Sequence, residues 1–97
     1  MNKTPALWNL VGIYFNQDWP EDYGSEEASI NAFLEDFARE RVELQNELKW
    51  ILDHFHDEDE LAAYLDAQGS EYLPPKELGG YRGWLIRILE QVRSAPA

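Results

Sequence analysis

The sequence contains no cysteine, and that absence removes several kinds of site at once. Disulfide bonds, thiolate metal sites, iron–sulfur clusters and a cysteine nucleophile are all excluded. Basic residues are also scarce, because 8 Lys and Arg stand against 19 Asp and Glu, and the formal net charge is −11. A charge of this sign repels phosphate backbones and anionic membrane surfaces, so we expect neither nucleic acid nor a membrane as a partner.

Long apolar runs are missing as well, since no stretch approaches the ~18 consecutive apolar residues of a membrane span. The N-terminal segment carries no small-residue cleavage site after its short apolar run, unlike a signal peptide. What the chain does have is 44% hydrophobic and 13% aromatic residues in a length of 97. This composition predicts a packed core, and the length fits a single domain, residues 1–97, of a cytoplasmic protein.

Apolar residues recur at helical spacing along most of the chain. Thr4 is the expected N-cap of the first helix, and Pro5 suits the first helical position. The buried stripe of this helix is expected to comprise Leu7, Leu10, Val11, Tyr14 and Phe15. No run of alternating β-branched residues and no hairpin dipeptide is present. The sequence therefore predicts an all-α fold, a single compact domain of about five short helices.

Helix-capping and helix-breaking residues predict where the next helices begin and end. Residues 16–25 contain Pro20 and Gly24, and we expect a structured loop whose Trp19 folds back on the body. Ser25 is the expected cap of a second helix. No Gly or Pro occurs from residue 29 to residue 55, but a single helix of that length would span about 40 Å, too long for a compact chain of this size. We therefore expect a break between residues 37 and 40.

Two further helices are expected in the second half. Asp57 and Glu60 form a capping box for a helix over residues 58–68, and Gly69 is its C-terminal glycine. Residues 70–80 hold two Pro and two Gly, and the helical stripe restarts at Tyr81 and ends near Ser94.

Few residues could carry chemistry. His54 and His56 are flanked by aspartates and could ligate a metal, but side chains two apart on a helix point to different sides. A role at the helix end explains them without a metal. No G-x-S-x-G motif and no glycine-rich phosphate loop occurs. We therefore expect no enzyme, cofactor or metal. A small metal-binding or catalytic domain that depends on the two histidines stays a distant alternative.

The acidic residues gather in two blocks that contain no Lys or Arg, one between Thr4 and Ala38 and one between Ile51 and Pro75. One interpretation is that both are solvated faces that keep a small protein soluble. The other is that they attract and block a basic partner. On the second interpretation the loop ranks first, because aromatic residues restrain it, and the candidates are Asp18, Glu21 and Asp22, followed by Asp57, Glu58, Asp59 and Glu60.

Short motifs at the two ends of the chain are more specific than its composition. The opening holds residues 5–10 (PALWNL), 14–19 (YFNQDW) and 22–24 (DYG). The closing part holds Tyr72 and residues 74–75 (PP), 81–82 (YR) and 84–85 (WL). With these motifs the chain resembles a family of immunity proteins from bacterial contact-dependent growth inhibition (CDI) systems. The resemblance covers both ends well and the middle only by helical pattern.

The resemblance implies a non-enzymatic cytoplasmic antitoxin. Its partner would be the C-terminal toxin domain that a neighbouring cell delivers, often a nuclease, and it would block the active site or a substrate surface. From the charge we expect this partner to be basic, and from its inhibitory role we expect one-to-one binding. The alternative is a general acidic interaction or adaptor module without a toxin partner, and a neighbouring reading frame for a large secreted toxin would discriminate the two.

Aromatic residues are expected to serve mainly as structural anchors. The anchors of the core and the loop are Tyr14, Phe15, Trp19, Tyr81 and Trp84. Trp8 lies off the main stripe of the first helix. It either packs against a second neighbour or offers an aromatic hot spot to a partner.

Overall fold

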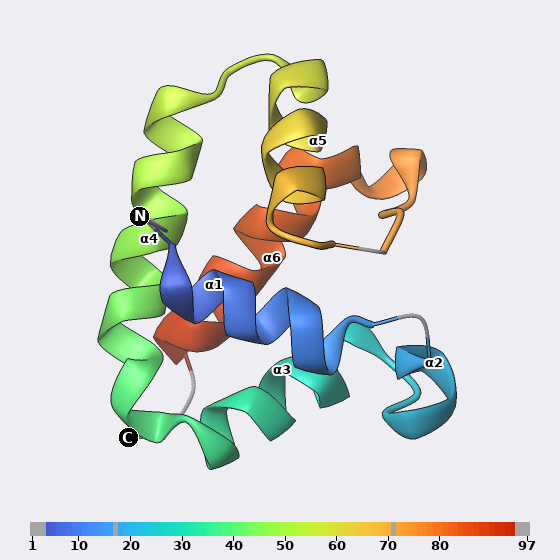
Figure 1. Cartoon of the computed structure of the whole chain (residues 1–97), viewed down its shortest axis with the longest axis vertical. Coiled ribbons are helices and arrows are strands. Elements are labelled where there is room, and N and C mark those ends of the chain that lie inside the picture. Colours follow the sequence, from blue (N-terminus) through green and yellow to red (C-terminus); the bar gives the residue numbers. More distant parts are fainter. Residues whose placement is uncertain (1–3, 17, 71, 95–97) are drawn as a thin grey trace.

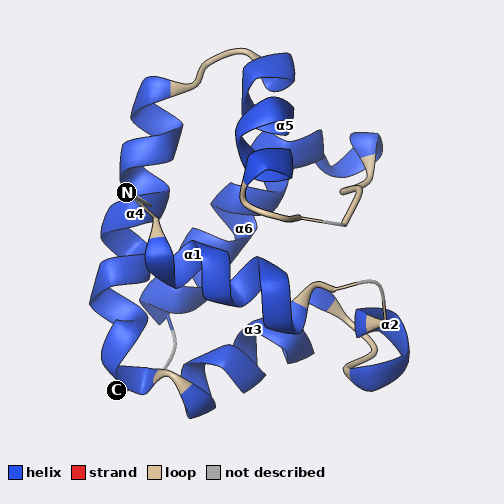
Figure 2. Ribbon diagram, in the orientation of Figure 1, coloured by secondary structure: helices blue, strands red, loops and turns tan. Residues whose placement is uncertain are grey.

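Helices make up nearly all of the regular structure. The computed structural model describes residues 4–16, 18–70 and 72–94, and within these ranges it contains no strand (Figure 2). The elements are α1 (Pro5–Asn9), the π-helical turn η1 (Leu10–Tyr14), α2 (Trp19–Asp22), α3 (Glu26–Asp36), the 3-10 turn η2 (Ala38–Glu40), α4 (Arg41–His54), α5 (Glu58–Ala67), the 3-10 turn η3 (Lys76–Leu78) and α6 (Gly80–Ser94). The expected all-α fold is confirmed, and α2 is a one-turn helix where we expected a loop.

The α6 helix lies behind α1 in the view of Figure 1 and packs against α3, α4 and α5. In this view α1 and η1 pass in front of α6, α4 stands along one side, α5 lies above and α3 below. The α1 helix packs against α4, and η1 packs against α3. The inward side chains of these helices form one hydrophobic core, in which Trp84, Phe15 and Phe33 are the largest fully buried residues. The radius of gyration of 12.3 Å matches a compact chain of this length. Among the helices of the described ranges, none combines the length and apolar character that crossing a membrane requires.

Several predicted boundaries are confirmed. The chain breaks between Asp36 and Arg41, where η2 separates α3 from α4. The Ser25 hydroxyl accepts the Ala28 N–H at 3.1 Å and so caps α3. Gly69 follows α5 with a φ of 89°, the left-handed conformation that ends many helices. All five apolar residues of the expected first stripe are buried, although the second half of this segment winds as a π-helix.

The cap of α1 corrects our expectation for Thr4. The Thr4 hydroxyl makes no cap hydrogen bond and instead contacts the Tyr64 hydroxyl at 2.9 Å. The N–H groups of Ala6 and Leu7 donate to the two carboxylate oxygens of Glu47, at 3.1 and 2.8 Å. Glu47 belongs to α4, so the N-terminus of α1 is fixed by a neighbouring helix.

Candidate partner-binding surface

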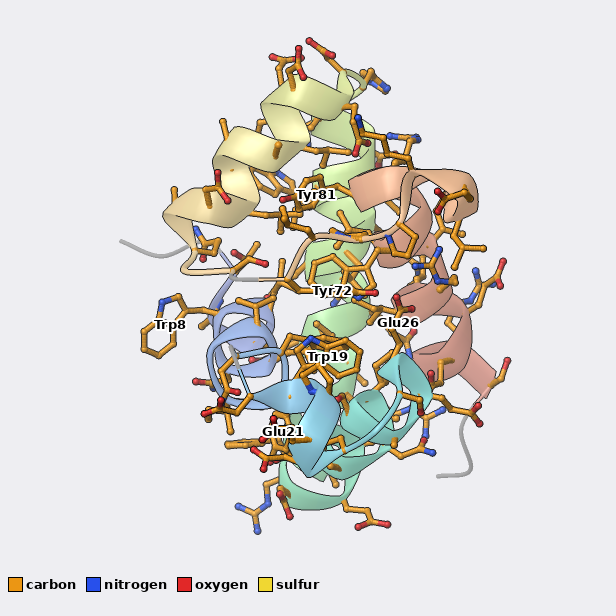
Figure 3. The ribbon with its side chains drawn as sticks, turned by 90° about the vertical axis from the view of Figure 1, so that its right-hand side faces the viewer. Trp8, Trp19, Glu21, Glu26, Tyr72 and Tyr81 are labelled. Carbon is orange, nitrogen blue, oxygen red and sulfur yellow. The ribbon has the colours of Figure 1, made fainter. Side chains whose placement is uncertain are left out.

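The acidic residues that rank first as candidates lie in the α2 helix and at the residue before it. Asp18, Glu21 and Asp22 are all exposed. Trp19 points back into the body, with its ring 5.2 Å from Phe15 and 5.0 Å from Tyr72 between centroids (Figure 3). The aromatic anchor thus holds a one-turn helix in place while its carboxylates face solvent.

A hydrogen-bonded turn joins η1 to α2. The Asn16 side chain donates to the Ile13 carbonyl at 3.1 Å and accepts the Asp18 N–H at 2.9 Å. The Asn16 carbonyl accepts the Trp19 N–H at 3.0 Å. Asn16 therefore fixes the direction in which α2 leaves the first helical segment.

The second acidic cluster is partly used inside the fold. Asp57 accepts the Asp59 N–H at 3.2 Å and so caps α5, one residue earlier than a capping box requires. Glu58 reaches α6, where its two oxygens accept the N–H groups of Tyr81 and Arg82 at 2.6 and 3.2 Å. All four residues of the cluster, Glu60 included, are exposed. The cluster therefore offers a partner fewer uncommitted carboxylates than its sequence suggests.

The structure does not bring the two groups of acidic candidates together. The α2 helix and the N-terminal end of α5 lie at opposite ends of the molecule (Figure 1). Glu71, which belongs to the second acidic block, lies outside the described residues. A single contact area would therefore be centred on one group or the other.

Two of the three basic residues of α6 are engaged inside the molecule. The Arg87 guanidinium donates two hydrogen bonds of 2.9 Å to Glu26, one from Nε and one from Nη2. The Arg82 side chain donates to the carbonyls of Leu52 and Phe55 at 3.4 and 3.1 Å, at the C-terminal end of α4. Both side chains therefore join α6 to neighbouring helices, Arg87 to α3 and Arg82 to the end of α4.

Glu26 belongs to a local network and not to the acidic surface. The Tyr72 hydroxyl donates to its carboxylate at 2.5 Å. Burial would raise the pKa of Glu26, but the hydrogen bonds from Arg87 and Tyr72 outweigh burial and hold that pKa below its ordinary value. Burial and the Glu26 carboxylate raise the pKa of Tyr72. The network joins α3, α6 and the segment before η3.

The aromatic residues divide by exposure. Of the five expected anchors, Tyr14, Phe15 and Trp84 are buried, and Trp19 and Tyr81 are partly buried. Trp8 is 53% exposed and points away from the body (Figure 3). The exposure of Trp8 argues against tight packing on a second neighbour, and its role as an aromatic hot spot for a partner stays a prediction.

The histidines lie at the end of α4. His54 and His56 are both exposed, and a ring nitrogen of His54 contacts the Trp50 carbonyl at 2.8 Å. The two rings of His54 and Trp50 lie 4.5 Å apart. Across the described ranges, the structure places no three His, Asp or Glu side chains together as metal ligands. The local contacts of His54 are those of a residue at a helix end.

A second exposed apolar surface lies beside the α5 cluster. A groove of about 290 Å³ runs between α5 and the segment around η3, with Ala62, Leu73 and Pro74 among its lining residues. Lys76 and Glu58 also line it. Asp59 lines it too, so one basic and two acidic residues border this groove, whereas the α2 surface carries carboxylates only.

These features define a small all-α protein whose exposed segments are acidic and whose basic residues partly stabilise its interior. The family model described as "CdiI immunity protein" matches residues 3–92, so the chain belongs to this family. It is thus an immunity protein, which neutralises a cognate toxin by binding it. The comparisons with curated proteins and with solved structures find no match.

Proposed function

We propose that the chain neutralises a basic CDI toxin domain, a nuclease, by one-to-one binding through the acidic residues Asp18, Glu21 and Asp22 of the α2 segment. The observation that carries this proposal is the combination of exposed carboxylates with a backbone that is already ordered. Trp19 and Asn16 restrain the segment, so little conformational entropy is lost when a partner binds.

A nuclease supplies the complementary surface. Its substrate groove must be rich in Lys and Arg to hold phosphates, and an acidic protein surface competes for the same groups. Occupation of that groove blocks the active site or the path of the substrate. Family membership supports the toxin partner, and the charge of −11 supports its basic character.

The test is a matched pair of triple charge reversals. One variant carries Asp18→Lys, Glu21→Lys and Asp22→Lys. The other carries Asp59→Lys, Glu60→Lys and Asp66→Lys on α5, which changes the net charge by the same amount at exposed positions. Binding to the purified toxin domain from the same locus is measured by titration calorimetry and stopped-flow mixing at two salt concentrations.

The α2 variant should bind at least about 100-fold more weakly at low salt, with slower association, while the α5 variant keeps most of its affinity. Both should melt within a few degrees of the wild type, since surface substitutions change stability little. The reverse ranking would place the interface at α5. A wild-type protein that neither binds the toxin nor suppresses its nuclease activity would contradict the proposal as a whole and favour an adaptor role.

A further inference from the structure

The outward face of α1 and η1 carries no charged residue. Pro5, Trp8, Gly12 and Ile13 are its exposed residues, and Asn9 is half-buried between them. Trp8 is 53% and Ile13 is 45% exposed. In a chain with 28% charged residues, a solvent-facing helix surface is normally where charges gather. A contiguous uncharged stripe with an exposed Trp at this position is typical of an interaction surface.

Gly12 has no structural reason to be glycine in the isolated chain. It lies within a helical segment, and its φ is not among the positive values that favour glycine. A Cβ atom placed on it would meet nothing within 4 Å. Glycine within a helix costs roughly 0.5–1 kcal/mol relative to alanine, so the residue destabilises α1 and η1 without any packing benefit from the described residues. The open position at Gly12 leaves room between Trp8 and Ile13 for a group that approaches from outside.

The winding of the segment also points to function. Residues Leu10–Tyr14 form a π-helical turn, and single π-turns in helices occur frequently at functional sites. Gly12 and Ile13 of this turn are exposed, as is Trp8 four residues before Gly12.

Carboxylates border part of this stripe. Asn9 donates to Glu40 at 3.3 Å, and Tyr14 donates to Asp36 at 2.5 Å, so both acidic residues lie beside the first helical segment. Asp18 follows through the turn that Asn16 holds against Ile13. The stripe is thus an apolar centre bordered by acidic residues on its α3 and η2 side and at the end that leads to α2.

We infer that Trp8, Gly12 and Ile13 form the apolar centre of the toxin interface, and that Gly12 leaves room for an apolar group of the toxin. The inference rests on the proposed function, because its occupant is the same basic toxin domain. The complementary toxin surface has an apolar projection ringed by Lys and Arg. A second copy of this chain fits poorly, because it would bring two acidic rims together.

Size variants at Gly12 separate binding from folding. In Gly12→Ala and Gly12→Gln the helix gains propensity, so the melting temperature should stay unchanged or rise by a few degrees. The dissociation constant for the toxin domain should increase with side-chain size, by about tenfold or more for Gly12→Gln. Trp8→Ala should raise it by about 30-fold or more. Leu78→Ala on η3 is the control, because Leu78 is similarly exposed (56%) and lies on another element.

Each outcome decides the inference. Stable Gly12 variants that bind less tightly in order of size, with Leu78→Ala unaffected, support it. Equal affinities for wild type, Trp8→Ala and Gly12→Gln would overturn it while leaving the toxin-binding function in place. Sedimentation that shows a wild-type dimer, dissolved by Trp8→Ala, would assign the stripe to self-association and overturn it as well. Failure of the wild type to bind the toxin would remove the proposed function and the inference together.

Discussion

Glu47 on α4 accepts the backbone N–H of Leu7 at 2.8 Å, and this contact fixes the N-terminus of α1 against the centre of the molecule. The same carboxylate accepts the N–H of Ala6. Glu47 is buried, with 8% of its surface exposed. A helix N-terminus provides unpaired N–H groups and a partial positive charge, so a buried carboxylate is well placed there. The contact positions α1, and therefore the stripe that contains Trp8.

Removing this cap should destabilise the fold. We expect Glu47→Ala to lower the free energy of unfolding by about 1–3 kcal/mol, because two buried N–H groups lose their acceptors. Glu43→Ala, at an exposed position one turn earlier on α4, should change it by no more than about 0.5 kcal/mol. Urea denaturation followed by circular dichroism measures both. Equal midpoints for the two variants would mean that the Glu47 cap contributes little.

The two carboxylates Glu47 and Glu26 should give stability profiles of opposite slope against pH. Burial raises the pKa of Glu47 above its ordinary value of 4.5 despite its two hydrogen bonds, whereas the pKa of Glu26 is lowered. The folded state therefore binds the Glu47 proton more tightly than the unfolded chain does, and the Glu26 proton less tightly. The stability that protonated Glu47 contributes is fully present below pH 4.5, and it is lost as the pH rises through the pKa of Glu47 in the folded state. The stability that ionised Glu26 contributes is fully present above pH 4.5, and it is lost as the pH falls through the pKa of Glu26 in the folded state.

Urea denaturation at several values between roughly pH 3 and pH 7 tests these signs. The stability advantage of the wild type over Glu47→Gln should shrink as the pH rises. Its advantage over Glu26→Gln should shrink as the pH falls. Parallel profiles for the two variants would contradict the opposite shifts.

The sequence predicts the helices well because their signals are local. The Ser25 cap, the helix break between Asp36 and Arg41, and the Gly69 terminus each depend on a few neighbouring residues. The α1 cap depends on a residue 40 positions away, and nothing local distinguishes Glu47 from the other acids of α4. Thr4 satisfied the local rule for a cap, but the hydrogen bonds of its hydroxyl to Tyr64 and Gln68 replaced that role.

The same distinction between local and long-range signals applies to the candidate surface. Exposure of Asp18, Glu21 and Asp22 follows from their loop-like composition, and the anchoring of Trp19 follows from its size. The stripe around Gly12 was not predicted, although a glycine inside a helical pattern was a signal that could have directed attention to it. The use of Glu58 by a different helix depends on the packing of α5 against α6, which no short sequence window contains.

That use of Glu58 separates two glutamates that look equivalent in the sequence. Both glutamates are exposed, but Glu58 accepts the N–H groups of Tyr81 and Arg82 at the start of α6. We expect Glu58→Ala to lower the free energy of unfolding by about 0.5–2 kcal/mol, the range for loss of a helix cap. Glu60→Ala should cost less, since it removes only a favourable charge from the first turn of α5.

Gly80 provides an independent check of the same contact. Its φ is 61°, and a Cβ atom placed on it would collide with the Glu58 carboxylate. Gly80→Ala should therefore destabilise the wild type, and Glu58→Ala should relieve the collision but not the backbone strain. A double-mutant cycle of these two substitutions, measured by urea denaturation, should show a combined loss smaller than the sum of the single losses. Strict additivity would mean that Glu58 does not cap α6 in solution, and its carboxylate would then be as available to the toxin as that of Glu60.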